Sequence, residues 1–352
     1  MHKNSLGWYQ YSGAMHMHTT DSDGAKPIEE VIAIGRSAGL EFMMFTDHMT
    51  LNQRDLGKEG IYGKTLVVIG YEHNDLKDEN HYLLFDTPAV YPESASAAEY
   101  VRMGEKDGAL GILAHPDEIR DALPEHPPYA WTDWSADGYT GIELWNQMSE
   151  WLEKLNRYNK LIMAFSPRKS MVGPTDRIMK TWDEVNLKRK AVGIAGVDAH
   201  AFPIKVGPMT VEIFPYKVHF RSLRCHLVLP EKFSGDFEIA RAQLYDAIRD
   251  CRLYFSNMRW GNADKFEFYA RNENEQAQCG GRITSVDGTR LYAKLPSRAR
   301  VRLIHNGEYQ VESMTDSLEF KVSSPGIYRL EAWKGKRGWI FTNHIRIGKW
   351  EI

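Results

Sequence analysis

The chain has 352 residues, enough for one large domain or for a large domain with a small one, and 43% of them are hydrophobic. Lys and Arg total 44 against 47 Asp and Glu, so the formal net charge is −3 and charge gives no support for nucleic-acid binding. The three cysteines are widely spaced and form no CxxC pair, which argues against a disulfide framework or a thiolate zinc site.

No window approaches the roughly 18 consecutive apolar residues that a membrane span needs, and the first residues lack the apolar core of a signal peptide. We therefore expect a cytoplasmic protein that binds neither membranes nor nucleic acid. Self-association into a homo-oligomer is left open.

Short apolar runs alternate with amphipathic segments as far as about residue 255. Apolar repeats at helical spacing predict helices over 27–40, 96–108, 149–162 and 237–251. Apolar runs that end in polar residues are typical of buried parallel strands, and they occur at 41–48, 65–72, 81–85, 108–116, 141–146 and 191–200. Strands that alternate with helices in this way predict an α/β fold with a parallel sheet or barrel.

The pattern changes after residue 254. Apolar and polar residues then alternate in segments rich in β-branched and aromatic types, separated by Gly, Pro, Asn and Asp. This predicts a small all-β domain, most simply a sandwich. We therefore divide the chain into an α/β domain, 1–254, and a β-sandwich domain, 255–352.

Histidines and acids gather at the C-terminal ends of the predicted strands, where α/β folds build active sites. In an extended segment residues i and i+2 point to one face, so His16 with His18, and Asp198 with His200, are expected to converge. Imidazoles and carboxylates without thiolates suit Zn²⁺, Mn²⁺ or Fe²⁺, and there are more ligands than one ion can use. The sequence therefore predicts two or three divalent ions per chain.

The run "HMHTTDSDG" (16–24) resembles the opening signature H-x-H-[ST]-x-x-S-D-G of the PHP (polymerase and histidinol phosphatase) superfamily of metal-dependent phosphoesterases. The runs "TDH", "GYE", "AHP" and "VDAH" resemble its later motifs in the same order, and the likeness covers about residues 12–255. It implies that 1–254 is a PHP hydrolase domain folded as a distorted (β/α)7 TIM-like barrel, with a di- or trinuclear metal centre. The implied ligands are His16, His18, Asp23, His48, Glu72, His81, His115, Asp198 and His200.

The resemblance also implies how these ligands divide. The first ion takes His16, His18, Glu72 and Asp198; the second takes Glu72, His81 and His115; the third takes Asp23, His48 and His200. A water that bridges two such ions is acidified to a pKa of roughly 7, so hydroxide is available as the nucleophile.

Three further catalytic roles and four substrate contacts are candidates. Asp198 could accept a proton and His200 could protonate the leaving oxygen, while Asp47 either orients an imidazole or caps local backbone. The candidate phosphate contacts are Arg54, Lys58, Arg168 and Lys169. Each of them can also be explained as a solvated charge on the surface. The Pro- and Trp-rich segment 123–134, with His126, is a candidate cover for the site mouth.

The C-terminal segment resembles the β-sandwich tail of some bacterial PHP proteins. Their closing strand reads like "WIFSNPI", whereas this chain has "WIFTNHIRI", with His344 in place of the expected proline. A packing or self-association role is favoured over carbohydrate binding for this domain.

The leading hypothesis is a phosphoesterase acting on a small phosphorylated molecule. The alternative enzyme is a hydrolase that uses the same metals on a carbamate or other non-phosphate ester. Convergent Arg or Lys side chains above the metals would indicate the first, and an apolar pocket, for example around Trp131 and Trp134, the second. Two further function classes stand beside these two hydrolases. One is a polymerase-associated accessory or nuclease domain, and the other is a metal-storing or purely binding protein.

Overall fold

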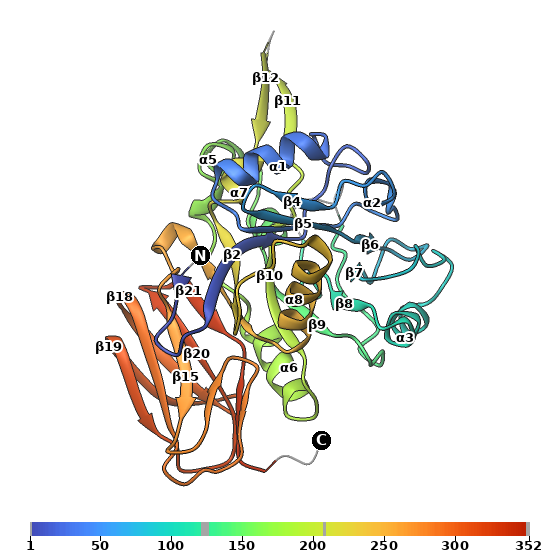
Figure 1. Cartoon of the computed structure of the whole chain (residues 1–352). Helices are drawn as coiled ribbons and strands as arrows, with labels where there is room; N and C mark the ends of the chain where they lie inside the picture. Colours follow the sequence, from blue (N-terminus) through green and yellow to red (C-terminus); the bar gives the residue numbers. More distant parts are fainter. Residues whose placement is uncertain (1, 121–126, 207–208, 350–352) are drawn as a thin grey trace. The chain divides into compact units, whose positions relative to one another are not determined.

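The computed structural model describes residues 2–120, 127–206 and 209–349 (Figure 1). The chain divides into two compact units. Unit 1 comprises Met1–Ser12, Val172–Ile194 and Cys225–Ile352, and unit 2 comprises Gly13–Met171 and Ala195–Arg224. These bounds differ from a division at 254/255, so the domains 1–254 and 255–352 stay a prediction.

Unit 2 is built from short strands and helices. Its strands, including the ends of two that continue from unit 1, are β2 (Tyr9–Met15), β3 (Phe42–Phe45), β4 (Gly60–Tyr62), β5 (Thr65–Ile69), β6 (Tyr71–His73), β7 (Tyr82–Phe85), β8 (Leu110–Leu113), β9 (Gly141–Asn146), β10 (Val192–Gly196), β11 (Phe202–Val206) and β12 (Met209–Ile213). Its helices are α1 (Ile28–Ser37), α2 (Asn52–Asp55), α3 (Ala97–Asp107), α4 (Gln147–Glu153), α5 (Lys160–Phe165), the 3-10 helix η1 (Pro167–Lys169) and α7 (Tyr216–His219). The positions of the strands predicted from the apolar runs are therefore confirmed, whereas the parallel direction predicted for all of them is wrong for β6 and β7.

The strands of unit 2 belong to separate sheets. β2 pairs in parallel with β3, β3 pairs in parallel with β5, and β4 is antiparallel to β5. A second sheet has the order β10-β9-β8-β7-β6, in which β7 is antiparallel to both of its neighbours. Two isolated parallel bridges, Met17 with Ala199 and His48 with Glu72, join chain segments just beyond the strand ends.

The α/β class is confirmed, whereas a TIM-like barrel is not, because the strands form no single closed sheet. The departure from strand–helix alternation lies between β6 and β7, where residues 74–81 form a short connection without a helix. Such a connection suits an antiparallel hairpin, since parallel neighbours need a longer crossover.

Helix α1 confirms the helix predicted over 27–40. Pro27 stands before its first residue, and Ile28, Val31 and Ile32 face the interior with helical spacing. The helices predicted over 96–108 and 237–251 are likewise confirmed as α3 and, in unit 1, α8 (Phe237–Arg249).

The single helix predicted over 149–162 is wrong, because the chain forms α4 and α5 with a turn between them. Two asparagines explain the break. Asn159 accepts a hydrogen bond from the Asn156 N–H at 2.8 Å and donates to the Lys154 carbonyl at 2.7 Å, so its side chain replaces helical backbone bonds.

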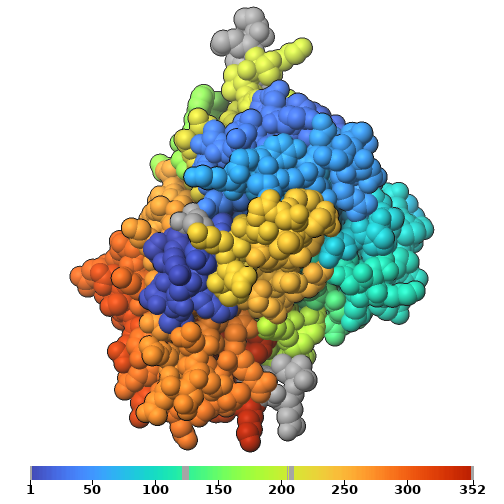
Figure 2. All heavy atoms as spheres, in the orientation of Figure 1, coloured from blue at the N-terminus to red at the C-terminus, as the bar shows by residue number. Residues whose placement is uncertain are grey.

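The β11–β12 hairpin projects from unit 2 in Figures 1 and 2. Its two strands are antiparallel and pair Phe202 with Ile213 at the base. No helix in the described part of the chain is long and apolar enough to cross a membrane.

Unit 1 is mainly antiparallel sheet. Besides α6 (Asp176–Asn186), α8 and η2 (Met258–Trp260), it contains β1 (His2–Lys3), most of β13 (Leu223–Leu229), β14 (Leu253–Asn257), β15 (Glu267–Arg271), β16 (Gln276–Gln278), β17 (Arg282–Ile283), β18 (Arg290–His305), β19 (Glu308–Lys321), β20 (Gly326–Lys334), β21 (Arg337–Thr342) and β22 (Ile345–Ile347). The long β18 pairs with β15, β19 and β20, and buried side chains such as Leu291, Leu330 and Trp339 form its core. The predicted all-β character after residue 254 is thus confirmed. These strands belong to one hydrogen-bonded set, so a sandwich of two separate sheets is not shown.

Candidate metal centre

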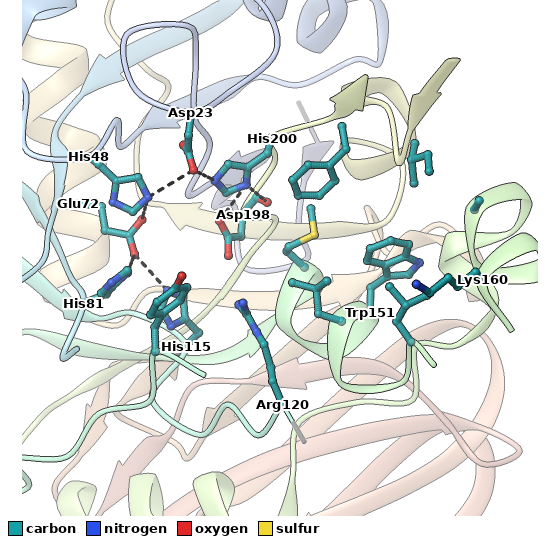
Figure 3. A pocket seen from close by; sticks show the side chains of 17 residues that line it. Asp23, His48, Glu72, His81, His115, Arg120, Trp151, Lys160, Asp198 and His200 are labelled. Atoms are coloured by element: carbon teal, nitrogen blue, oxygen red, sulfur yellow. Dashed lines mark hydrogen bonds and ion pairs between the residues drawn. The ribbon is translucent and has the colours of Figure 1, made fainter. Parts of the chain in front are cut away.

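The predicted ligands meet in unit 2 because they stand at the ends of neighbouring strands. His16 follows β2, His48 follows β3, and His115 follows β8, while Glu72 lies within β6. Figure 3 shows that seven of the nine point toward one end of a single cavity. Each of the nine belongs to at least one group of three or four residues whose ligand atoms lie within 4.8 Å of one another.

The carboxylate of Glu72 lies between two pairs of histidines. Its Oε2 is 2.9 Å from His16 Nε2 and 3.2 Å from His18 Nε2. Its Oε1 is 2.8 Å from His81 Nδ1 and 3.1 Å from His115 Nε2. One carboxylate with a different oxygen directed at each pair is the arrangement expected of a ligand shared by two ions.

Two aspartates extend the cluster. Asp198 Oδ1 lies 3.3 Å from Nε2 of both His16 and His18. Asp23, whose side chain is partly exposed, places Oδ2 3.1 Å from His200 Nε2. The possible ligand groups share members, so the division of ligands among ions stays a prediction.

The acids at the centre of the cluster remain ionised. Burial on its own raises the pKa of Glu72, but His16, His48 and His81 hold it well below its usual value. Asp198 is likewise buried, and His16 with the other nearby imidazoles lowers its pKa. Buried negative charge of this kind requires positive charge close by.

The imidazoles respond to the same field. Burial on its own lowers the pKa of His18, but Asp198 and Glu72 raise it to about 10. Burial also opposes protonation of His81, whose pKa is raised to about 9 by Glu72 and Asp78. The cluster therefore attracts cations, which protons or divalent metals can both supply.

Hydrogen bonding distinguishes between these two kinds of cation. Both ring nitrogens of His18, and Nδ1 of His115, are buried without a hydrogen bond to any described residue. Buried polar atoms are nearly always satisfied, so nitrogens left open among carboxylates fit ligands of an ion. With imidazole and carboxylate donors and no thiolate, the residues present fit Zn²⁺, Mn²⁺ or Fe²⁺.

The backbone explains why His16 and His18 converge, and it corrects the alternation argument. His16, His115 and Asp198 adopt positive φ angles of 64°, 27° and 48°. The extended conformation assumed for His16 and Asp198 is therefore wrong. A left-handed backbone turns the chain at the strand end and redirects the side chains, at a cost that non-glycine residues bear mainly at functional sites.

Glu143, in the middle of β9, supports the cluster and was missed by the sequence interpretation. Its Oε1 accepts a hydrogen bond from His16 Nδ1 at 2.9 Å, and its Oε2 accepts one from the His115 N–H at 2.7 Å. Asn146 donates to Glu143 at 2.9 Å and to Asp198 at 3.2 Å. Such contacts fix which ring nitrogen faces a metal. An acid inside the apolar run "GIELWN" was the available signal.

Of the two roles predicted for Asp47, the structure shows the contact with local backbone and not the orientation of an imidazole. Its carboxylate accepts hydrogen bonds from the Thr19 N–H at 2.7 Å, the Thr19 hydroxyl at 2.8 Å and the Ser22 hydroxyl at 2.8 Å. Asp47 thus holds the loop that carries Asp23, while the imidazole-orienting carboxylate is Glu143.

The cavity at the cluster has a volume of about 430 Å³ and contains two cationic side chains in its described lining, Arg120 and Lys160 (Figure 3). Arg120 is held by Glu118, which accepts a bond from its Nε at 2.6 Å, and lies 5.1 Å from the centre of the Tyr129 ring. The Tyr129 ring stacks on His81 with ring centroids 4.9 Å apart. Arg120 is therefore a fixed cation beside the predicted ligands.

The four predicted phosphate contacts lie outside this described lining. Arg54 donates to the Thr87 carbonyl at 2.6 Å, and Lys58 pairs with Glu29 at 2.6 Å. Arg168 donates to the Arg221 carbonyl at 3.1 Å, and Lys169 is exposed on η1.

The segment 123–134 contributes differently from the expectation. His126 lies outside the described residues. Trp131 is buried, and its indole N–H donates to the Asp133 carbonyl at 2.7 Å, so it packs in the interior instead of lining the cavity. Among the described residues of this segment, 127–134, Tyr129 lines the cavity.

Neither a protein-family profile nor a curated protein matches the chain. It is similar to the solved structure of a two-domain protein from Bacteroides vulgatus that contains a predicted PHP-like metal-dependent phosphoesterase, at 12% identity, TM-score 0.47, with 97% of this chain and 96% of that chain covered. It is also similar to a Bifidobacterium adolescentis protein named as a metal-dependent phosphoesterase, at 13% identity, TM-score 0.32, over 56% of this chain and 91% of that one. A third likeness is to an amidohydrolase from Chromobacterium violaceum, at 16% identity, TM-score 0.29, over 58% and 92%.

The first two of these structures bear the name of the activity that the sequence motifs predict. At such identities and scores they assign no activity to this chain. The activity proposed for this chain depends on its own residues.

Proposed function

We propose that this chain is a metal-dependent phosphoesterase that hydrolyses a small phosphorylated molecule at a centre of two or three divalent ions. The observation that carries the proposal is the convergence of nine imidazole and carboxylate side chains, seven of which line one end of a cavity that also contains Arg120. Open nitrogens on His18 and His115 support metal binding at that end. The fixed guanidinium supports an anionic substrate.

The residues divide the work of hydrolysis. Divalent ions bound here would supply an acidified water as the nucleophile, together with positive charge for the phosphoryl oxygens. Arg120, restrained by Glu118 and Tyr129, is placed to bind a phosphoryl oxygen without having to be ordered first. Asp198 is the candidate proton acceptor, and Glu143 keeps His16 oriented.

His200 is less suited to the proton-donor role than the sequence implied. Its Nδ1 faces the Asp198 carbonyl at 3.0 Å, which leaves Nε2 as the nitrogen near Asp23. If Nε2 binds an ion, the ring has no proton to give to the leaving oxygen. The proposal therefore assigns His200 to the metal ligands.

A second candidate is hydrolysis of a carbamate or other non-phosphate ester at the same centre. The apolar side chains that line the rest of the cavity, among them Trp151 and Leu152, favour it. Arg120 beside the cluster favours the phosphoester, because the N–H groups that its ion pair with Glu118 does not use can donate to the oxygens of a phosphoryl group.

Metal content and turnover test the proposal together. The purified chain is loaded with Mn²⁺ or Zn²⁺, its ions are counted by elemental mass spectrometry, and turnover of 4-nitrophenyl phosphate is measured for wild type, His18→Ala and the control His305→Ala. We expect two to three ions in wild type and in the control, and loss of metal with loss of turnover in His18→Ala. Absence of bound metal in wild type would overturn the proposal. Full metal content with turnover of 4-nitrophenyl acetate alone would establish the second candidate instead.

A further inference from the structure

The cavity has two chemically different ends. Figure 3 shows the predicted metal ligands on one side, Lys160 on the opposite side, and Trp151 between them. The wall away from the ligands comes from α4, the turn that follows it, and the base of the β11–β12 hairpin. Its side chains are those of Met148, Trp151, Leu152, Leu155, Phe202 and Ile213.

This wall is firmly packed and offers little to a polar ligand. Met148 and Trp151 are 2% and 4% exposed and belong to a buried hydrophobic cluster with Met163 and Phe214. The only polar group of Trp151, its indole N–H, already donates to the Met163 carbonyl at 3.2 Å. Its ring therefore presents only apolar surface.

Polar groups in the described lining are confined to the two ends. Apart from the predicted metal ligands, they are Arg120 and Tyr129 beside the cluster and Lys160 opposite. A sugar or nucleobase would bring hydroxyl or amide groups into the middle of the cavity, where no described side chain can replace their bonds to water. Leaving one such group without a partner weakens binding roughly 5- to 150-fold.

We propose that the substrate is a phosphomonoester of a hydrocarbon-rich alcohol that carries an anionic group at its far end. This inference rests on the proposed phosphoesterase function and names the substrate class. The phosphoryl group lies at the metal ligands with Arg120, the hydrocarbon body lies along Trp151 and Phe202, and the terminal anion meets Lys160. Hydrolysis transfers the phosphoryl group to water and releases the alcohol with inorganic phosphate.

Binding of non-hydrolysable phosphonates tests the hydrocarbon part. Dissociation constants of n-alkylphosphonates from methyl to octyl are measured by calorimetry with the Mn²⁺-loaded chain. Burial of one methylene contributes roughly 0.8 kcal/mol, so each added carbon is expected to tighten binding about three- to fourfold until the cavity is filled. A dissociation constant that does not change with chain length overturns the inference.

Two exposed residues of the β11–β12 hairpin provide matched variants that keep the fold. Phe202 lines the cavity and is 38% exposed, whereas Val211, on the neighbouring strand, is 39% exposed and does not line it. Because the Phe202 ring stacks on His200 with centroids 6.0 Å apart, the ions per chain are counted in both variants. With its metal content retained, Phe202→Ser is expected to weaken octylphosphonate binding about tenfold and methylphosphonate binding far less, while Val211→Ser changes neither. Equal effects of the two substitutions contradict the placement of the hydrocarbon body.

A second pair of variants tests the terminal anion. Wild type is expected to bind 6-phosphonohexanoate about 1.4- to 5-fold more tightly than hexylphosphonate, since an exposed ion pair contributes about 0.2–1 kcal/mol. Lys160→Met removes this preference, and Lys169→Met, which changes a lysine outside the described lining, retains it. Equal binding of the two phosphonates by wild type contradicts the inference that the substrate carries an anionic group at its far end.

Hydrolysis of the matching alkyl phosphates separates the two proposals. Turnover of all chain lengths with equal kcat/KM supports the phosphoesterase and overturns the substrate class. Chain-length-dependent phosphonate binding without turnover of any phosphate ester overturns the phosphoesterase and still supports the apolar body and anionic end of the ligand. Tighter binding of glucose 6-phosphate than of hexylphosphonate overturns the substrate class directly.

Discussion

Unit 1 and unit 2 each bury a cluster of acidic and basic side chains, and the clusters differ in how their polar atoms are satisfied. In unit 1, Asp183 accepts two bonds from Arg329 and one from His344, each at 2.7 Å. Arg329 donates a further bond to Glu331 at 2.6 Å. The pKa of Asp183 falls to about 2: burial alone would raise it, but Arg329 and His344 outweigh that effect.

In unit 2 the carboxylates are surrounded by imidazoles, and neither arginine nor lysine is among the nine predicted ligands. Both nitrogens of His18 remain without hydrogen bonds to described residues. An arginine keeps its charge and closes the acid's bonding positions permanently, whereas an imidazole can exchange its proton for a metal ion. Whether the basic partner of the buried carboxylates is arginine or histidine thus distinguishes a structural cluster from a metal site more clearly than the number of buried acids does.

The strongest test of this contrast exchanges one buried glutamate for glutamine in each cluster. Glu72→Gln removes the shared carboxylate, and we expect it to lower 4-nitrophenyl phosphate turnover by roughly three orders of magnitude, equivalent to several kcal/mol of transition-state stabilisation. Elemental mass spectrometry should show fewer ions per chain. Glu331→Gln should keep both metal and turnover, and a similar loss in the two variants would remove the distinction between the clusters.

Removal of the arginine should affect stability instead of catalysis. Arg329→Met leaves Asp183 buried without its main partner, so we expect the free energy of unfolding to fall by about 3–5 kcal/mol in urea titrations. Arg290→Met breaks an exposed pair with Glu319 and should change it by less than about 1 kcal/mol. Equal effects of the two substitutions would show that the buried network is not structural.

Acid should weaken unit 1 through His344. Burial lowers the pKa of this residue from 6.5 to about 4, so the unfolded chain binds the proton more readily than the folded one. Its contribution to stability is complete above about pH 6.5 and is lost as the pH falls toward 4, by up to about 3 kcal/mol. Urea titrations from pH 7 to pH 4 should therefore show a steeper loss for wild type than for His344→Asn. Parallel curves would exclude His344 as the source.

The smallest expected effect concerns the carboxylate behind the ligands. Glu143→Gln weakens the orientation of His16, and we expect metal affinity, measured by competition with a chelator, to fall about 10- to 100-fold. Glu150→Gln alters a nearby buried acid that accepts a bond from the Trp145 indole, and it should leave metal affinity unchanged. If Glu143→Gln leaves metal affinity unchanged, Glu143 has a structural role and does not orient a metal ligand.

The local elements could be predicted from sequence because their signals are local. Apolar runs predicted β3 and β8, which His48 and His115 follow, and apolar spacing with Pro27 predicted α1. Part of the convergence could be predicted as well, because residues that follow neighbouring parallel strands lie together. The full set of nine came from the family resemblance, and it includes His81, which precedes the antiparallel strand β7. The break within the helix predicted over 149–162 could not be predicted, because the Asn159 side chain bonds to the Asn156 N–H and the Lys154 carbonyl, and the Asn156 side chain accepts from the Tyr158 N–H.

The substrate side of the cavity could not be predicted, because it depends on contacts between distant segments. Arg120 follows β8 in a stretch without clear periodicity, and only its contacts with Glu118 and Tyr129 identify it as a fixed cation. Arg54 and Lys58 matched the expected loop positions equally well, yet they lie outside the described lining of the cavity and bond to Thr87 and Glu29. Loop position selects candidates, and the partners of each charge decide among them.

The left-handed backbone at His16, His115 and Asp198 also sets a trade-off for engineering this chain. Sparsely populated conformations of this kind cost about 1–3 kcal/mol per residue. Replacing His16 with glycine or asparagine, which tolerate positive φ, would relieve that strain together with the burial of a charged imidazole. Selection for thermal tolerance alone would therefore favour the loss of ligands, and a stabilised descendant of this chain should be checked for metal before it is kept.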